Sequence, residues 1–370
     1  VGNSNSYGEV GNTDALVVRT DIDGNPVWIE VFGGQGADYA RDVIGLADGG
    51  FLIGGYSSSY STWEAYYLLK VDSLGEQVWY QTYSTGYGET YGRGLLHSPQ
   101  GGYLLYGYCE EPDGNPDDGW ATKVDNSGDV EWSQVYDLSN VDRFFDGLAS
   151  WDQGYLLTGY THSPDSSYNR ALIKIDDDGM LQWYRTYGDS LTDRLYGIDI
   201  GYEGGFVLVG NTFVGNNRQF WIVKTDVDGE VEWEQVFGGD GEDYLRDIKC
   251  MNDGSYLVVG YTDSYGNGYE DAWLMQVDQY GQEVWSRALG TWGQDHAWAI
   301  ESIGNNEYLV SGDTRVGSYQ DGWALKLVPA DDTGEIIITE IMRDPDAVLD
   351  SEGEWFELYN PGPNNINLLG

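Results

Sequence analysis

The chain has 370 residues and a formal net charge of −44, with 62 acidic side chains against 18 basic ones. A surface this acidic repels nucleic acid and anionic lipid and attracts cations, so we expect no nucleic-acid partner. There is also no run of eighteen apolar residues, so we expect no segment that inserts directly into a membrane.

A cassette of about fifty residues recurs along the chain. Each copy holds an apolar stretch ending in Asp, a Gly turn and a closing tryptophan, at 16–28, 67–79, 120–132, 171–183, 221–233 and 273–285, and a seventh copy begins at 323–328. The closing tryptophans, 50 to 53 residues apart, are Trp28, Trp79, Trp132, Trp183, Trp233 and Trp285. A period of this size is the mark of a propeller, a solenoid or an array.

Every cassette carries four strand signals. In the copy at 273–285 an apolar strand is followed by a turn at Gly281 and by EVWSRAL. A third strand, such as 41–47, follows a Gly-rich loop, and a Gly-marked hairpin joins it to a fourth, such as 51–57. Four antiparallel strands in about fifty residues make one blade of a β-propeller.

Counting these signals predicts an all-β propeller. Six innermost, seven second, seven third and six outermost strands are found, which seven four-stranded antiparallel blades explain best, with one inner and one outer strand supplied from upstream or missing. Six or eight blades also fit. The first residues, VGNS, match the end of a repeat strand, so we expect the chain to open within a cassette.

The repeated side chains also predict how neighbouring blades pack. We expect each tryptophan, and the aromatic residue four positions later, to wedge between blades and to stabilise the fold by burying apolar area. Five of the six lysines occupy one repeat position, filled by Arg19 in the first copy, so we expect structural partners for them inside each module. Cys109 and Cys250 lie three cassettes apart and are predicted to be free thiols.

Two stretches of the chain resemble known families. The segments GGQGADYARDVIGLADGGFLIGGYS (33–57) and GGDGEDYLRDIKCMNDGSYLVVGYT (238–262) look like a propeller repeat of secreted, multi-domain bacterial proteins, which implies a propeller over residues 1–330. Residues 335–370, with EIIITEIMRDPD and GEWFELYNPG, look like the opening of a lamin-tail domain, which implies a partial immunoglobulin-like sandwich after a linker at 331–334.

An acidic residue recurs just before each innermost strand. The set is Asp38, Glu89, Asp142, Asp193, Asp243 and Asp295. The loops on this side of a propeller lie on one face, so these carboxylates could form a ring that binds Ca²⁺, an ion that takes six to eight oxygen ligands. The alternative is that each aspartate caps its own loop by accepting backbone N–H groups.

Other acidic residues break the repeat or sit in its turns. The loop 109–120 is rich in carboxylates, and its counterpart 264–273 is rich in Gly and Tyr, a pattern that suits a calcium site or a carbohydrate-binding face. Candidate calcium ligands in the first loop are Glu110, Asp113, Asp117 and Asp118. The turns at 21–24, 176–179 and 226–229 resemble calcium loops, but an Asp-capped hairpin turn explains them as well.

The sequence shows no recognisable catalytic constellation. It contains three histidines, no HExxH motif and no serine in a nucleophile elbow. We therefore expect a secreted or cell-surface binding or structural module that acts in adhesion or assembly, with calcium as a possible aid and no other cofactor. The expected partners are an extracellular protein, a carbohydrate or further copies of the chain. The alternative is an extracellular enzyme that acts on polysaccharide through paired carboxylates.

Overall fold

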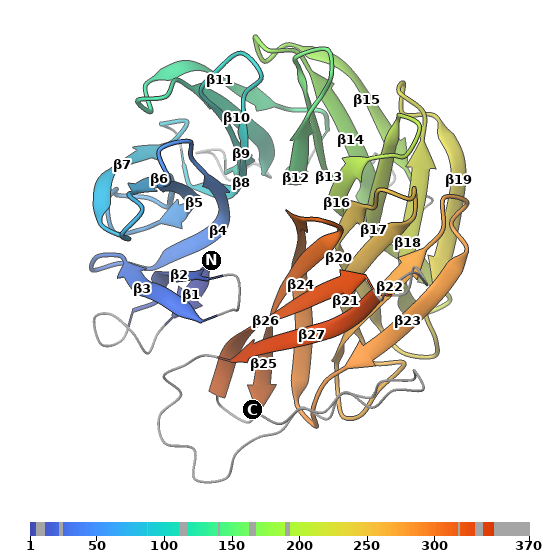
Figure 1. The fold of residues 1–370 in the computed structure, drawn as a ribbon. Helices are drawn as coiled ribbons and strands as arrows, with labels where there is room; N and C mark the ends of the chain where they lie inside the picture. Colours follow the sequence, from blue (N-terminus) through green and yellow to red (C-terminus); the bar gives the residue numbers. More distant parts are fainter. Residues whose placement is uncertain are drawn as a thin grey trace.

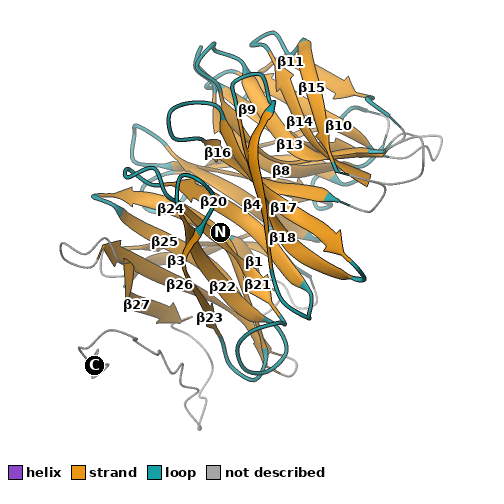
Figure 2. Cartoon of the chain, turned by 90° about the vertical axis from the view of Figure 1, so that its right-hand side faces the viewer, coloured by secondary structure: helices purple, strands orange, loops and turns teal. Residues whose placement is uncertain are grey.

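The computed structural model describes residues 1–4, 12–21, 25–86, 88–110, 117–139, 141–162, 168–188, 193–316, 319–329 and 336–343. Over these ranges the chain is all-β, and its strands form seven separate antiparallel sheets. The sheets are arranged as blades around a common axis (Figure 1), and Figure 2 shows strands and loops only. No helix that could cross a membrane is found in the described residues.

The blades follow one another in chain order. Blade 1 holds β1 (Gly2–Ser4), β2 (Asp14–Thr20) and β3 (Pro26–Phe32). Blade 2 holds β4 (Asp38–Gly45), β5 (Phe51–Ser57), β6 (Ala65–Val71) and β7 (Gln77–Tyr83). Blade 3 holds β8 (Thr90–His97), β9 (Tyr103–Cys109), β10 (Asp118–Val124) and β11 (Val130–Tyr136). Blade 4 holds β12 (Asp142–Ala149), β13 (Tyr155–His162), β14 (Tyr168–Ile175) and β15 (Leu181–Tyr187).

The remaining blades repeat the pattern. Blade 5 holds β16 (Arg194–Ile200), β17 (Phe206–Val214), β18 (Asn217–Thr225) and β19 (Val231–Phe237). Blade 6 holds β20 (Asp243–Cys250), β21 (Tyr256–Thr262), β22 (Asp271–Val277) and β23 (Glu283–Leu289). Blade 7 holds β24 (Gln294–Gly304), β25 (Glu307–Val316), β26 (Tyr319–Pro329) and β27 (Ile336–Arg343). The prediction of a seven-bladed propeller is confirmed, with three described strands in blade 1 and four in each of the others.

The last outer strand has an origin that the sequence did not reveal. We expected an outer strand to be missing or to come from upstream, but β27 pairs antiparallel with β26, from Trp323↔Arg343 to Pro329↔Ile336. Its run of Ile residues suits a strand, and it covers an edge of β26 that would otherwise expose unpaired backbone groups. The pairing brings eight residues of the predicted second domain into the propeller sheet. The linker 331–334 and residues 344–370 lie outside the described residues.

The inner strand of every four-stranded blade is bulged. In blade 2 the register shifts between Ala40 and Asp42 on β4, opposite Gly55 on β5. A Cβ on Gly55 would lie 1.7 Å from the carbonyl oxygen of Tyr39, so only glycine fits where the bulged strand approaches. The same close approach occurs in each of the other five blades, at Gly107, Gly159, Gly210, Gly260 and Gly312. This contact recurs in all six four-stranded blades, and their inner strands therefore share one backbone geometry.

The repeated aromatic residues join neighbouring blades, as predicted. The indole of Trp132 on β11 donates a hydrogen bond to the carbonyl oxygen of Asp177 in blade 4, at 2.7 Å. The hydroxyl of Tyr136 donates to the carbonyl oxygen of Gly179 in the same turn, at 2.8 Å. The equivalent bonds elsewhere are Trp28 to Ser73, Trp233 to Gln279, Tyr83 to Gly128 and Tyr187 to Gly229. The buried apolar clusters accordingly span pairs of blades.

The repeated lysines have carboxylate partners. Lys70 pairs with Asp48 within blade 2 at 2.8 Å, as expected. Lys123 on β10 instead reaches into the next blade, where its ammonium lies 2.8 Å from Asp177. The cations therefore hold neighbouring modules together as well as single ones. The two cysteines are free thiols, with Cys109 buried and Cys250 half-buried.

Candidate functional site

The aspartates that precede the inner strands cap loops. The carboxylate of Asp38 accepts the backbone N–H of Gly34 at 2.9 Å, and also the hydroxyls of Ser57 and Ser59. Asp142, Asp243 and Asp295 accept backbone N–H groups in the same way, from Leu138 and Ser139, from Gly239, and from Thr291. All four are buried. These hydrogen bonds show that four of the six acids cap their loops, and calcium binding by the ring stays a prediction.

In the other two blades the structure describes different contacts. Asp193 forms a buried ion pair with Arg170 of blade 4, at 3.0 Å, and residues 189–192 of its loop lie outside the described residues. In blade 3 the capping position is taken by Thr90, which pairs with Cys109 as Asp38 pairs with Ser57. Glu89 lies one residue earlier, so its inclusion in the ring was wrong by one position. The regular spacing from the tryptophans misplaced this position because the segment between β7 and the capping residue is one residue longer than the corresponding segments of the other blades.

One group of carboxylates in the described chain could hold a metal ion. Ligand atoms of Asp118, Asp137 and Asp142 lie within 4.8 Å of one another. Burial raises the pKa of Asp142, and Asp137 raises it further, as expected of carboxylates that crowd together. The sequence had singled out Asp118 and Asp142 but missed Asp137, which no repeat signal marks. Calcium binding here stays a prediction.

The other predicted ligands are separated from this group or used elsewhere. The carboxylate of Asp117 pairs with the guanidinium of Arg143. Glu110 is exposed, and its pKa is raised by partial desolvation and by the nearby Glu89 and Asp117. Asp113 lies outside the described residues. The Asp–Gly turns are Asp-capped hairpins, since the Asp226 carboxylate accepts the N–H groups of Asp228 and Glu230, each at 2.9 Å.

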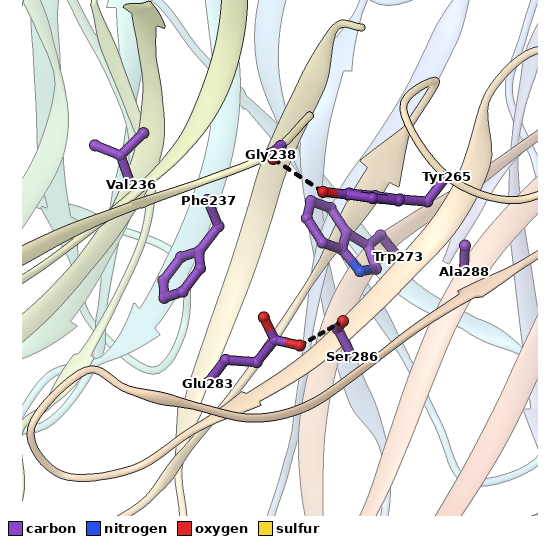
Figure 3. Close-up of a pocket in the computed structure, with 8 residues that line it drawn as sticks. All are labelled: Val236, Phe237, Gly238, Tyr265, Trp273, Glu283, Ser286 and Ala288. Atoms are coloured by element: carbon purple, nitrogen blue, oxygen red, sulfur yellow. Dashed lines mark hydrogen bonds between the residues drawn. The ribbon is translucent and has the colours of Figure 1, made fainter. Parts of the chain in front are cut away.

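A pocket lies where blade 5 meets blade 6. It has a volume of about 460 Å³. It is lined by Val236, Phe237, Gly238, Tyr265, Trp273, Glu283, Ser286 and Ala288 (Figure 3). The loop 264–273, which the sequence marked as a carbohydrate-binding candidate, contributes Tyr265. We call this space the aromatic pocket.

Aromatic rings line one side of the aromatic pocket, and the polar side chains of Glu283 and Ser286 line another. Tyr265 packs on Trp273 with ring centroids 5.1 Å apart, and its hydroxyl donates to the carbonyl oxygen of Gly238 at 2.9 Å. Trp273 is nearly fully buried, whereas Tyr265 remains 46% exposed and presents its ring to solvent. Opposite these rings, the hydroxyl of Ser286 donates to the carboxylate of Glu283 at 2.8 Å (Figure 3).

Comparison with blade 2 explains why blade 6 has this space. In blade 2, Tyr60 packs between Tyr67 and Tyr80, with a centroid separation of 4.4 Å from Tyr80. Tyr60 and Tyr67 occupy the repeat positions of Tyr265 and Trp273, and Tyr80 occupies that of Ser286. The small side chain of Ser286 therefore leaves open the volume that a tyrosine ring fills in blade 2.

Further aromatic side chains are exposed on the loop that carries Tyr265 and on the loop that precedes blade 7. Tyr269 is 74% exposed, and Trp292, on the adjoining loop, is 82% exposed. The two loops are in contact, since the N–H of Tyr269 donates to the carbonyl oxygen of Gly293. Exposed aromatic rings that gather on neighbouring loops are typical of a ligand-binding face.

No protein-family model and no curated protein sequence matches the chain. Among solved structures, the chain is similar to puromycin hydrolase, with 15% identity over 81% of this chain and 46% of that chain, and a TM-score of 0.51. It is also similar to Sqt1 from Chaetomium thermophilum, with 13% identity over 93% of this chain and 83% of that chain, and a TM-score of 0.50. The chain thus spans about half the length of the hydrolase.

These likenesses support the propeller fold. At such identities they carry no residue of one protein's site onto another, and the fold itself hosts unrelated functions. Several similar structures are enzymes, including an endo-1,4-β-xylanase from Bacteroides thetaiotaomicron with 9% identity over 81% of this chain and 94% of that chain, at a TM-score of 0.42. The function has to be argued from the site.

Proposed function

We propose that this protein is a non-catalytic binding propeller that works outside the cell and takes a carbohydrate chain in the aromatic pocket. The observation that carries the proposal is the arrangement of Tyr265 and Trp273 against Glu283 and Ser286. Sugar rings stack their C–H faces on aromatic side chains, while carboxylate and hydroxyl groups accept and donate hydrogen bonds to sugar hydroxyls. A protein that binds such chains can serve adhesion or extracellular assembly.

The competing proposal is a polysaccharide-acting enzyme. Glycosidic hydrolysis ordinarily uses two carboxyl groups on either side of the scissile bond, about 5 to 10 Å apart. The residues that line the aromatic pocket include one carboxylate, Glu283, which is exposed and holds the hydroxyl of Ser286. This supports binding over hydrolysis.

The test exploits the difference between blades 2 and 6. Ser286→Tyr restores the ring that fills this volume in blade 2, so it should abolish sugar binding without disturbing the fold, whereas Ser286→Thr, which keeps the hydroxyl on a small side chain, should retain binding. Binding is measured by affinity electrophoresis in gels that contain neutral polysaccharides, such as xylan, β-glucan and galactan, with release of reducing ends measured in parallel.

The expected result is retardation of the wild-type protein in at least one gel, loss of retardation in Ser286→Tyr, and no reducing ends. Retardation that Ser286→Tyr leaves unchanged would place sugar binding elsewhere. Release of reducing ends that Glu283→Gln abolishes would establish the enzyme instead.

A further inference from the structure

The inner strands carry a second set of recurring residues, around the mouth of the central channel. Two positions matter, one residue and three residues after the capping residue of each inner strand. They are occupied by Tyr39 and Arg41, Tyr91 and Arg93, Arg143 and Phe145, Arg194 and Tyr196, Tyr244 and Arg246, and His296 and Trp298. Five of the six described inner strands thus pair one arginine with one aromatic residue. We call this set the arginine belt.

The arginine belt is unusual in so acidic a protein. Of twelve arginines in the sequence, five lie in the belt, although acidic residues outnumber basic ones by 62 to 18. Arg143 pairs with Asp117, but among the described residues no carboxylate lies within 4.0 Å of Arg41, Arg93, Arg194 or Arg246. These guanidinium groups contact aromatic rings and tyrosine hydroxyls instead.

Arg246 shows how the belt holds its cations. Its guanidinium lies 4.6 Å from the ring centroid of Tyr196 and 4.8 Å from that of Trp298, and it donates to the hydroxyl of Tyr261 at 2.6 Å. Such cation–π contacts fix the side chain without neutralising its charge. The Nε groups of Arg194 and Arg246 are buried and have no hydrogen-bond partner in the described structure.

Between blades 5 and 6 the belt opens into a cavity of about 200 Å³. It is lined by Arg194, Tyr196, Asn211, Arg218, Tyr244 and Arg246. Arg218 comes from β18, and its guanidinium lies 3.2 Å from Glu242 and 2.7 Å from the hydroxyl of Tyr244. Three guanidinium groups therefore converge on one cavity, with one carboxylate at ion-pair distance from them.

A single substitution in the repeat accounts for this cavity. Asn211 on β17 pairs in register with Arg194, at a position where blades 2, 3, 4 and 6 all have tyrosine. Those tyrosines are Tyr56, Tyr108, Tyr160 and Tyr261. Their rings stack within the belt, for example Tyr39 on Tyr56 with centroids 4.7 Å apart. Because Asn211 has no ring, the space beside Arg194 and Arg246 stays open.

Three aspartates farther along the inner strands already accept hydrogen bonds from neighbouring blades. Asp42, Asp146 and Asp247 lie one residue beyond the belt, and each accepts a backbone N–H from the inner strand of a neighbouring blade, at 2.8 to 2.9 Å. Burial raises the pKa of each, to about 6 for Asp42 and for Asp247, which weakens their negative charge near that pH. The three guanidinium groups are therefore not paired with these acids.

We propose that this cavity binds an oxyanion, the carboxylate or sulfate ester of an acidic sugar, through Arg194, Arg218 and Arg246. Guanidinium forks match planar oxyanions with two parallel hydrogen bonds, and the partly desolvated cavity strengthens such charge-assisted bonds. Tyr196 and Tyr244 also line the cavity, beside these guanidinium groups. The site lies apart from the aromatic pocket and shares no residue with it.

The test measures binding of digalacturonate and of a sulfated disaccharide by isothermal titration calorimetry at low ionic strength, with cellobiose as the neutral probe. We expect saturable binding of at least one acidic probe, competition by inorganic sulfate, and at least tenfold weaker binding in Asn211→Tyr, which supplies the ring of the other blades. The tighter of the two acidic probes identifies the anion as carboxylate or sulfate.

Two variants keep the result decisive. Arg246→Lys keeps a positive charge but loses the planar fork, so it should also weaken binding at least tenfold even if Asn211→Tyr folds poorly. Ser286→Tyr should leave acidic-probe binding unchanged, which separates this site from the proposed carbohydrate pocket. Absence of acidic-probe binding to the wild-type protein, or binding that neither Asn211→Tyr nor Arg246→Lys weakens, would overturn the proposal.

Discussion

The buried ion pair between blades 4 and 5 offers the sharpest test of the physical account of the fold. The guanidinium of Arg170 lies 3.0 Å from the carboxylate of Asp193, and the two side chains are only 3% and 1% exposed. The guanidinium also stacks over Trp221, 3.9 Å from its ring centroid. Replacing Arg170 by Met keeps much of the volume but leaves the Asp193 carboxylate buried without its cation.

Removal of one partner of a buried ion pair costs about 3–5 kcal/mol of unfolding free energy, because the remaining charge has lost its compensation. Asp193→Asn in the Arg170→Met background removes that charge. The double variant should therefore regain part of the loss, and the two single losses should not add.

Equilibrium urea unfolding followed by tryptophan fluorescence is the suitable assay. A loss below about 1 kcal/mol in Arg170→Met, or a double variant whose loss equals the sum of the single losses, would refute the reasoning, since both results require a pair with no net coupling.

Two further predictions concern the acidic residues. Burial and the neighbouring Asp295 raise the pKa of Asp271 to about 7, so its contribution to stability is complete below about pH 4 and is lost as the pH rises through 7. Gln219 holds the corresponding position in blade 5, so the test variant is Asp271→Gln. It should have a higher Tm than the wild type at pH 8 but not at pH 4. A difference in Tm that does not change with pH would contradict this. Calcium should raise Tm by binding to Asp118, Asp137 and Asp142. Asp137→Asn should reduce that rise, whereas Asp129→Asn, a control substitution in a turn, should not. If calcium leaves the wild-type Tm unchanged, the site is absent.

The sequence was sufficient for the fold because the fold repeats. The Trp spacing gave the length of the repeat, and the count of strand signals predicted seven blades. The contacts of Trp132 and Tyr136 with the next blade follow from the packing of neighbouring blades. The outer strand β27 escaped prediction because it lacks the tryptophan that marks the other outer strands. Its Ile-rich sequence instead resembled another domain.

The candidate sites were harder to predict, because both depend on what a repeat position lacks. The loop 264–273 was recognised, but the pocket beside it exists because Ser286 replaces a ring. The oxyanion cavity similarly depends on Asn211, which stands in the sequence as an ordinary polar residue. Conversely, the aspartates before the inner strands attracted attention because they recur, and recurrence reflects their common task of capping loops.

The close contact between each bulged inner strand and a glycine on its neighbour has a consequence for engineering. Since backbone atoms alone make this contact, the side chains that face the channel can be exchanged between blades without rebuilding the scaffold. Transplanting the arrangement of Arg194, Asn211, Arg218 and Arg246 to the junction of blades 2 and 3 should create a second site of the proposed kind. A ring of such sites would convert a single-valent molecule into a multivalent one, with avidity set by the fixed angle between blades.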